Sequence, residues 1–160
     1  MDNEHLINHK KVLPTFISRY CKTNLLRPAN ILKVGESDCV SYLQLKLPDC
    51  SITEHILGQG RVTPDIHWDV VFAPDILNYQ ESHSQLKYAV NALKVFTEIS
   101  NVFVNYLPYN RKLGLTPKQL RLRINDMTDL RAEEVYRLET AHYNTGKEKK
   151  MTTYVWELKR

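Results

Sequence analysis

The sequence predicts an α+β fold in which a small antiparallel sheet packs on one long amphipathic helix and a smaller module follows. Three observations carry this prediction. Short stretches of alternating apolar and polar residues recur over 31–72, which is typical of half-buried strands. A wide apolar stripe without glycine or proline runs over 84–107, which favours a single helix. Residues 115–158 then follow the order helix, turn, helix, hairpin.

The composition is that of an ordinary globular protein. Of the 160 residues, 42% are hydrophobic and 25% are charged, which is typical of a folded domain with a core. No apolar run approaches the ~20 residues that a membrane-spanning helix needs. The N-terminus is acidic and polar and shows no secretory signal, so we expect a cytoplasmic protein, or a nuclear one in a eukaryote.

The cysteines indicate a reducing environment. Cys21, Cys39 and Cys50 are widely spaced and form no Cys-x-x-Cys pair. An odd number of cysteines without such a pair predicts reduced, partly buried thiols rather than a disulfide framework or a zinc site.

The first seventy residues predict a helix followed by strands. The helix begins near Leu13, because Pro14 suits a first helical turn and apolar residues then recur at helical spacing. The segment 51–64 lacks the signature of a phosphate-binding loop and predicts a connecting loop. Strands are predicted over three ranges: 31–34, 40–47 and 66–72.

The long helix over 84–107 is predicted to form the core on which both halves of the chain pack. Ser84 is a suitable N-cap, and the helix ends before the polar break at Pro108–Arg111. We place a domain boundary at this break. Residues 1–110 then form an N-terminal α+β domain for dimerisation or partner binding, and residues 111–160 form a basic module.

The charge is distributed unevenly between these two parts. Residues 1–110 contain ten Lys/Arg and eleven Asp/Glu, whereas residues 111–160 contain twelve and seven. The C-terminal part therefore carries a net charge of +5 against −1 for the rest. A basic module joined to a neutral one favours a polyanionic partner, although a solvated basic face without a partner has the same pattern.

The C-terminal part predicts two helices and a hairpin. Thr116 is a good N-cap with Pro117 at the first helical position, and a polar turn follows at Asn125–Asp126. The second helix is predicted over Arg131–Ala141. A corner at Gly146–Lys147 and a strand over Thr152–Leu158 complete the module.

The order of these elements is similar to that of a known family of DNA-binding proteins. The run Leu115-Thr116-x-x-Gln119-Leu120, followed by Val135-x-x-Leu138-Glu139, resembles the signature of bacterial winged-helix regulators. The linker between Leu120 and Val135 is longer than the tight turn of that family. The resemblance implies a helix-turn-helix module with a wing, and hence a duplex DNA-binding protein, a transcriptional regulator that acts as a homodimer through its N-terminal domain.

The resemblance also implies which side chains contact the DNA. In a winged helix the second helix enters the major groove and the hairpin lies along the backbone. Arginines on that helix read base edges, since a guanidinium forks onto guanine, and lysines meet phosphates. The implied contacts are Arg131 and Arg137 to bases, Lys118 and Arg121 to flanking phosphates, and Lys147, Lys149 and Lys150 in the wing.

The N-terminal part suggests an alternative of another class. The runs Leu13–Ser18, Leu43–Pro48 and His67–Phe72 follow a helix–strand–strand order. This order is faintly similar to the ubiquitin-conjugating-enzyme-like domain of the scaffold subunit in the BRISC deubiquitinase complex. That resemblance implies a non-catalytic protein-interaction scaffold.

No enzyme class is predicted. The sequence lacks the His-Glu-x-x-His, Gly-x-Ser-x-Gly, phosphate-loop and dinucleotide fingerprints. Asp65, His67 and Asp69 suggest a metal-dependent nuclease site, but in an alternating strand a hydrated outer face explains them better. We therefore predict no catalytic residue, no metal and no cofactor.

Overall fold

The computed structural model describes residues 7–58, 67–108, 112–144 and 147–160. Its strands are β1 (Ile7–Asn8), β2 (Asn30–Val34), β3 (Ser51–His55), β4 (Val70–Ala73), β5 (Asn101–Tyr106), β6 (Arg131–Asn144) and β7 (Lys147–Lys159). Its helices are the short 3-10 turn η1 (His9–Lys11), α1 (Val12–Asn24), α2 (Val40–Lys46), α3 (His83–Lys94) and α4 (Pro117–Thr128).

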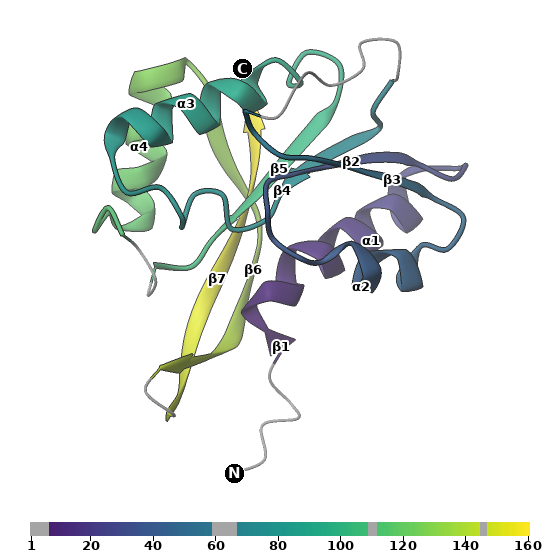
Figure 1. Cartoon of the computed structure of the whole chain (residues 1–160), viewed down its shortest axis with the longest axis horizontal. Helices are drawn as coiled ribbons and strands as arrows, with labels where there is room; N and C mark the ends of the chain where they lie inside the picture. The colour runs from purple at the N-terminus through teal and green to yellow at the C-terminus, as the bar shows by residue number, and fades with distance from the viewer. Residues whose placement is uncertain (1–6, 59–66, 109–111, 145–146) are drawn as a thin grey trace.

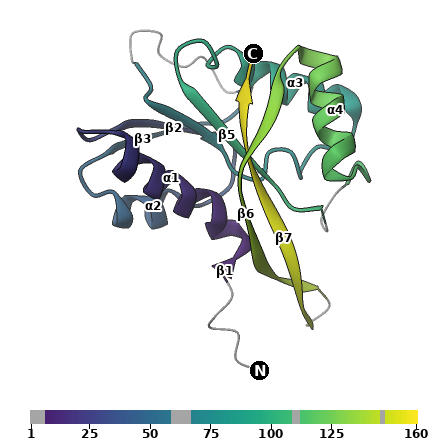
Figure 2. The ribbon, with the colours of Figure 1, turned by 180° about the vertical axis from the view of Figure 1, so that it is seen from behind.

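The described strands form one seven-stranded mixed sheet in the order β1-β6-β7-β5-β4-β2-β3. The strands β3, β2, β4 and β5 run parallel to one another, and β7 pairs antiparallel with both β5 and β6. Helices α1 and α2 lie on one face and α3 and α4 on the other (Figures 1 and 2). The predicted α+β fold with a small antiparallel sheet is therefore wrong, because the sheet is largely parallel and has helices on both faces.

The sequence of the central strands explains these three layers. All four residues of β4 are buried, as expected of a parallel strand covered on both sides. Successive side chains point to opposite faces, so Val70 and Phe72 pack with the α1–α2 side while Val71 and Ala73 pack with the α3–α4 side. Each face thus has its own apolar cluster.

Two of the predicted elements in the N-terminal part have a different structure. The predicted strand 40–47 is helix α2, because Leu43 and Leu47 are buried one turn apart while Leu45 is exposed. The predicted helix 84–107 is helix α3 followed by strand β5. Its N-cap is Ser82, whose Oγ accepts a hydrogen bond from the backbone N–H of Gln85.

The predicted helix-turn-helix is also absent from the structure. Residues 131–141, predicted as the recognition helix, belong to strand β6. A β-bulge between Glu134 and Tyr136 interrupts the pairing of β6 with β7. An extra residue at a bulge shifts the side-chain alternation, so that Leu130, Val135 and Leu138 occur at a spacing close to that of a helix.

Other predictions are confirmed. The helix near Leu13 is α1, the strand 31–34 lies in β2, and the strand Thr152–Leu158 lies in β7. Thr116 caps α4 in a full capping box with Gln119, which satisfies two backbone N–H groups at the start of the helix. Part of the predicted strand 66–72 is β4, whereas β3 lies within the predicted loop.

Strands from both sides of residue 110 belong to the same sheet. Val102 of β5 lies opposite Leu158 of β7, and Tyr106 lies opposite Tyr154. The β6–β7 hairpin continues past this pairing as a long arm, along which β1 pairs with β6 at Thr140 and Ala141 (Figure 1). In the described part of the chain, no helix is long and apolar enough to cross a membrane.

Candidate functional site

The parallel strands bring several loops together at one edge of the sheet. The chain leaves β2 through α2 to reach β3 on one side, and it leaves β4 through α3 to reach β5 on the other. The two crossover helices lie on opposite faces of the sheet (Figure 1). The strand order therefore reverses between β2 and β4, and ligands of open parallel sheets bind at the carboxyl ends of the strands beside such a reversal.

A pocket of about 170 Å³ lies at this point. The loops that follow β2, β3 and β4 all contribute to it, so its walls come from three separate parts of the chain. Its apolar and aromatic side chains suit a ring system, whereas Glu36 and Gln80 supply polar contacts. The pocket is lined by Gly35, Glu36, Ile56, Leu57, Pro74, Ile76, Tyr79 and Gln80.

Gly35 forms a turn directly after the end of β2. Its φ angle is +108°, a region that residues with a side chain rarely adopt. No heavy atom lies within 4 Å of the position that a Cβ would occupy. Its backbone N–H donates to the carbonyl oxygen of His55 (2.9 Å), which joins the loops after β2 and β3.

The buried Lys33 side chain stabilises the Gly35 loop by hydrogen bonding. The side chain is 2% exposed, and its Nζ donates to the carbonyl oxygen of Gly35 (2.8 Å) and to Oε1 of Glu54 (3.4 Å). Buried charges are normally paired in this way. The basic residue therefore fixes the glycine turn to both β2 and β3.

The loop after β4 is clamped to the end of β5 by two side-chain amides. Oδ1 of Asn105 accepts from the backbone N–H of Asp75 (2.6 Å), and Nδ2 of Asn105 donates to Oδ1 of Asp75 (2.8 Å). Asn78 pairs in the same manner with the backbone N–H and carbonyl oxygen of Leu107. Both asparagines and Asp75 are buried, so these bonds hold the pocket wall formed by residues 74–80.

Besides Gln80, the residues of the pocket that can bind polar groups of a ligand are Tyr79 and Glu36. Burial, and then the nearby Asp75 carboxylate, raise the pKa of the Tyr79 phenol above its ordinary value. The hydroxyl therefore stays protonated at neutral pH and serves as a hydrogen-bond donor rather than a base. The exposed Glu36 carboxylate supplies a negative charge at the mouth, which favours a cationic ligand.

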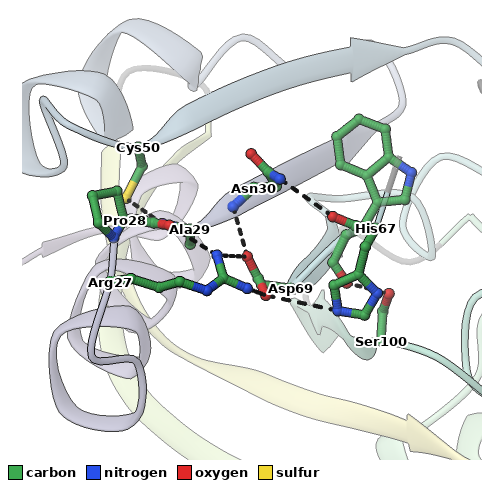
Figure 3. Close-up of polar contacts among 9 residues, drawn as sticks. Arg27, Pro28, Ala29, Asn30, Cys50, His67, Asp69 and Ser100 are labelled. Atoms are coloured by element: carbon green, nitrogen blue, oxygen red, sulfur yellow. Dashed lines mark hydrogen bonds and ion pairs between the residues drawn. The ribbon is translucent and has the colours of Figure 1, made fainter. Parts of the chain in front are cut away.

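The opposite edge of the sheet carries a separate polar network (Figure 3). The Asp69 carboxylate is 6% exposed and accepts two hydrogen bonds from the Arg27 guanidinium (2.7 and 3.1 Å) and one from the backbone N–H of Asn30 (2.8 Å). The backbone N–H of Asp69 donates in return to the carbonyl oxygen of Asn30. These contacts join the amino ends of β2 and β4 as a structural brace.

This network does not form the nuclease site considered from the sequence. Nε2 of His67 lies 3.8 Å from Asp69, and the His67 side chain is 62% exposed. Asp65 lies outside the described residues. Among those that are described, no group of three or more His, Cys, Asp or Glu side chains is arranged to hold a metal ion.

The residues predicted to contact DNA fall into separate groups. Arg137 of β6 pairs with Glu134 and lies over the Tyr154 ring. Lys150 is exposed on β7, and the side chains of Lys147 and Lys149 lie outside the described residues. One pocket between α4 and β6 brings three of the predicted residues together: Lys118, Arg121 and Arg131.

All three cysteines, each within the described residues, are free thiols. Burial raises the pKa of the Cys21 and Cys39 thiols to about 12. Because the thiolate is the reactive form, we expect both to resist iodoacetamide at pH 8 in the folded protein and to react in denaturant. Mass spectrometry of the alkylated peptides measures this, and rapid native labelling of Cys39 would contradict the closed structure beside the Gly35 loop.

The folded-state pKa values also fix the pH dependence that these two thiols contribute. Because both are raised, the folded protein holds the thiol protons more tightly than the unfolded chain does. This contribution to stability is fully present below the ordinary thiol pKa of about 8.5 and declines as pH rises from there towards 12.

No protein-family model matches the chain, and no curated protein matches it. Solved structures do resemble it in fold. One is the N-methyltransferase NodS from Bradyrhizobium japonicum WM9 in complex with S-adenosyl-L-homocysteine (SAH), with a TM-score of 0.55, 10% identity, and coverage of 93% of this chain and 87% of that chain.

Two further structures resemble the chain over similar lengths. Magnesium protoporphyrin IX methyltransferase (ChlM) from Synechocystis PCC 6803 with bound SAM has a TM-score of 0.56, 10% identity and coverage of 95% and 79%. The release-factor-specific protein-(glutamine-N5) methyltransferase from Alicyclobacillus acidocaldarius has a TM-score of 0.53, 12% identity and coverage of 95% and 93%. Identities this low establish a shared fold.

These likenesses overturn the functional predictions from the sequence. The chain has the fold of SAM-dependent methyltransferases, and not that of winged-helix regulators or of ubiquitin-conjugating-enzyme-like scaffolds. Double-stranded DNA as partner and a role in transcription regulation were inferred from a recognition helix that is in fact strand β6. The solved structures that share this fold are those of methyltransferases, and they count against the prediction that the chain is not an enzyme.

Proposed function

We propose that the chain is a methyltransferase that binds SAM in the pocket at the carboxyl ends of β2, β3 and β4. The observation that carries the proposal is the position of this pocket at the reversal of strand order, between the Gly35 loop and the clamped β4 loop. The similar folds solved with bound SAM or SAH support it. The free thiols of the chain support the cytoplasmic location predicted from the sequence, where thiols stay reduced.

The residues of the pocket fit part of SAM. The open space beside Gly35 allows a ligand to approach the backbone closely. Ile56, Leu57 and Ile76 offer apolar walls for the adenine ring, and Glu36 offers a carboxylate to a cationic ligand. The volume of about 170 Å³ is below the ~300–1,000 Å³ of most small-molecule pockets, so the described walls accommodate only part of the ligand.

Each side chain has a defined part in this proposal. When bound, SAM would supply a methyl group carried by a positively charged sulfur. A nucleophilic acceptor would receive the methyl group, and SAH would remain. The Glu36 carboxylate stabilises the positive charge of the ligand. The Tyr79 hydroxyl donates a hydrogen bond to an acceptor atom of the ligand. Lys33 keeps the Gly35 turn in place, while Asn105 and Asn78 hold the wall beyond it.

The test is SAM and SAH binding by isothermal titration calorimetry with two matched variants. Glu36→Gln and Asp38→Asn each remove one exposed negative charge from the same loop, but only Glu36 lines the pocket. We expect Glu36→Gln to weaken SAM binding about threefold to tenfold, as for one charge-assisted contact near the surface. Asp38→Asn should change it less than about twofold.

Equal losses from the two variants would show that general charge, and not a contact in the pocket, attracts the ligand. If the unmodified chain binds neither SAM nor SAH, the proposal is wrong.

A further inference from the structure

A second and larger pocket lies between α4 and the start of β6. Its volume is about 450 Å³, and it shares no lining residue with the pocket at the carboxyl ends of the strands. Lys118 and Arg121 lie three residues apart on α4, so they share a helix face. Arg131, the first residue of β6, lines the same pocket. Three basic side chains therefore surround one cavity.

Arg121 is held in place by the protein itself. Its Nε donates to the carbonyl oxygen of Ala132 (2.8 Å), and its guanidinium carbon lies 6.0 Å from the ring centre of the buried Trp156. A guanidinium over an aromatic ring is stabilised by cation–π attraction. Its terminal amino groups form no hydrogen bond or ion pair with any residue that the structure describes. A fixed guanidinium with free donors is suited to a planar or tetrahedral anion.

The charges around this pocket are not neutralised by the protein. Within the described residues, no carboxylate lies in ion-pair distance of Lys118, Arg121 or Arg131. Several other basic side chains do have such partners, among them Arg137 with Glu134 and Arg160 with Glu98. Like charges around one cavity repel one another, and an anion bound between them removes that repulsion.

The remaining lining residues define the rest of the ligand. Leu122 is 58% exposed and lines the pocket, so it offers an apolar contact beside the cations. The Glu133 carboxylate is directed to Lys159 at 3.3 Å. Nδ2 of Asn125 donates to the carbonyl oxygen of Leu130, which leaves its Oδ1 to accept a hydrogen bond. The pocket thus combines a cationic wall with an apolar one.

We propose that this pocket binds a small anion whose carboxylate or phosphate group is attached to an apolar body. The anionic group contacts Arg121, Arg131 and Lys118, and the apolar body lies on Leu122. An inorganic anion leaves Leu122 exposed to water, so it binds more weakly than an anion that carries a ring. The site is separate from the proposed SAM site, and SAH binding does not depend on it.

The test is calorimetric titration of the full chain at low ionic strength with phenyl phosphate, benzoate and inorganic phosphate. Lys118→Gln combined with Arg131→Gln removes two cations whose side chains bond to none of the residues that the structure describes, so we expect the fold to be kept. Arg123→Gln is the matched control, because Arg123 is on the same helix, contacts His83 and does not line the pocket. Leu122→Ser tests the apolar contact.

We expect phenyl phosphate to bind about tenfold more tightly than inorganic phosphate, since burial of part of a ring contributes about one factor of ten. The double variant should weaken phenyl phosphate and benzoate binding at least about tenfold, and Arg123→Gln less than about twofold. Leu122→Ser should remove the preference for the ring. The tighter of the two organic anions identifies the anionic group.

Three results overturn the proposal. One is the absence of binding of both organic anions up to about 10 mM. Another is a loss from Arg123→Gln as large as that from the double variant, which assigns the binding to overall surface charge. The third is inorganic phosphate binding as tightly as phenyl phosphate. SAH binding is expected to be unchanged in the double variant. The failure of the anion site can therefore be distinguished from the failure of the methyltransferase proposal.

Discussion

Replacing Asn105 by leucine is expected to lower the free energy of unfolding by about 2–4 kcal/mol, because it leaves a buried N–H and a buried carboxylate without partners. Leucine is close to asparagine in size, so little cavity forms. Asn105 supplies the hydrogen bonds to both the backbone N–H and the carboxylate of Asp75, and Asp75 adopts a left-handed backbone conformation (φ 59°) that needs such support. Urea unfolding followed by tryptophan fluorescence measures the change.

The same variant should also weaken SAH binding, because Pro74, Ile76, Tyr79 and Gln80 line the proposed pocket beside Asp75. Asn101→Leu is the matched control at the other end of β5, where the side chain donates to Glu157 and is partly buried. We expect it to cost no more than about 1 kcal/mol and to leave SAH affinity unchanged. Equal effects of the two variants on stability and on affinity would mean that the Asn105 clamp does not position the pocket.

Replacing Asp69 by alanine is expected to lower the free energy of unfolding by about 2–4 kcal/mol, since a nearly buried carboxylate with three hydrogen bonds is lost. The backbone N–H of Asn30 then has no acceptor, and β2 and β4 keep only their backbone hydrogen bonds at the amino edge (Figure 3). The Arg27 side chain is 60% exposed, so water replaces the hydrogen bonds that its guanidinium loses. Thermal unfolding measured by circular dichroism gives the change.

His67→Ala provides the control for this brace. The imidazole is exposed and lies 3.8 Å from Asp69, so its removal should change stability by less than about 0.5 kcal/mol. SAH affinity should be unaffected by either change, because the brace is at the edge of the sheet opposite the pocket. A loss below about 1 kcal/mol for Asp69→Ala would contradict the role of the carboxylate as a brace.

The sequence predicted local features where the signal is a specific side-chain contact. Thr116 and Pro117 predicted the start of α4, because a cap depends on a contact three positions along the chain, and the structure adds a capping box with Gln119. The strand 31–34 and the helix near Leu13 were predicted for similarly local reasons. Such signals depend little on the rest of the fold.

Periodicity failed where one pattern fits two structures. Leu43, Leu45 and Leu47 alternate as in a strand, yet Leu43 and Leu47 are also one helical turn apart and are the two that are buried. The apolar residues of α3 continue into β5 without glycine or proline, so nothing in the sequence marks the end of the helix. Because α2 was predicted as a strand and β5 as a helix, the predicted elements did not alternate between strand and helix. That alternation is the pattern that predicts a parallel sheet.

The candidate site was missed for a related reason. Gly35 follows a strand that was predicted correctly, and a helix begins five residues later, which is the order of many nucleotide-binding turns. A single glycine is a weak signal, and the following helix was predicted as a strand. Asn105 and Asn78 gave no signal at all, because their partners Asp75 and Leu107 lie about thirty residues away along the chain.

Binding of SAH at the carboxyl ends of β2, β3 and β4 is tested most directly by titration of the ¹⁵N-labelled chain with SAH, followed by two-dimensional NMR. We expect the largest chemical-shift changes at the backbone N–H groups that line the carboxyl-edge pocket, with small changes at the pocket between α4 and β6. The absence of any shift, or shifts confined to α4 and β6, would contradict the proposal that this fold binds SAM where its parallel strands end.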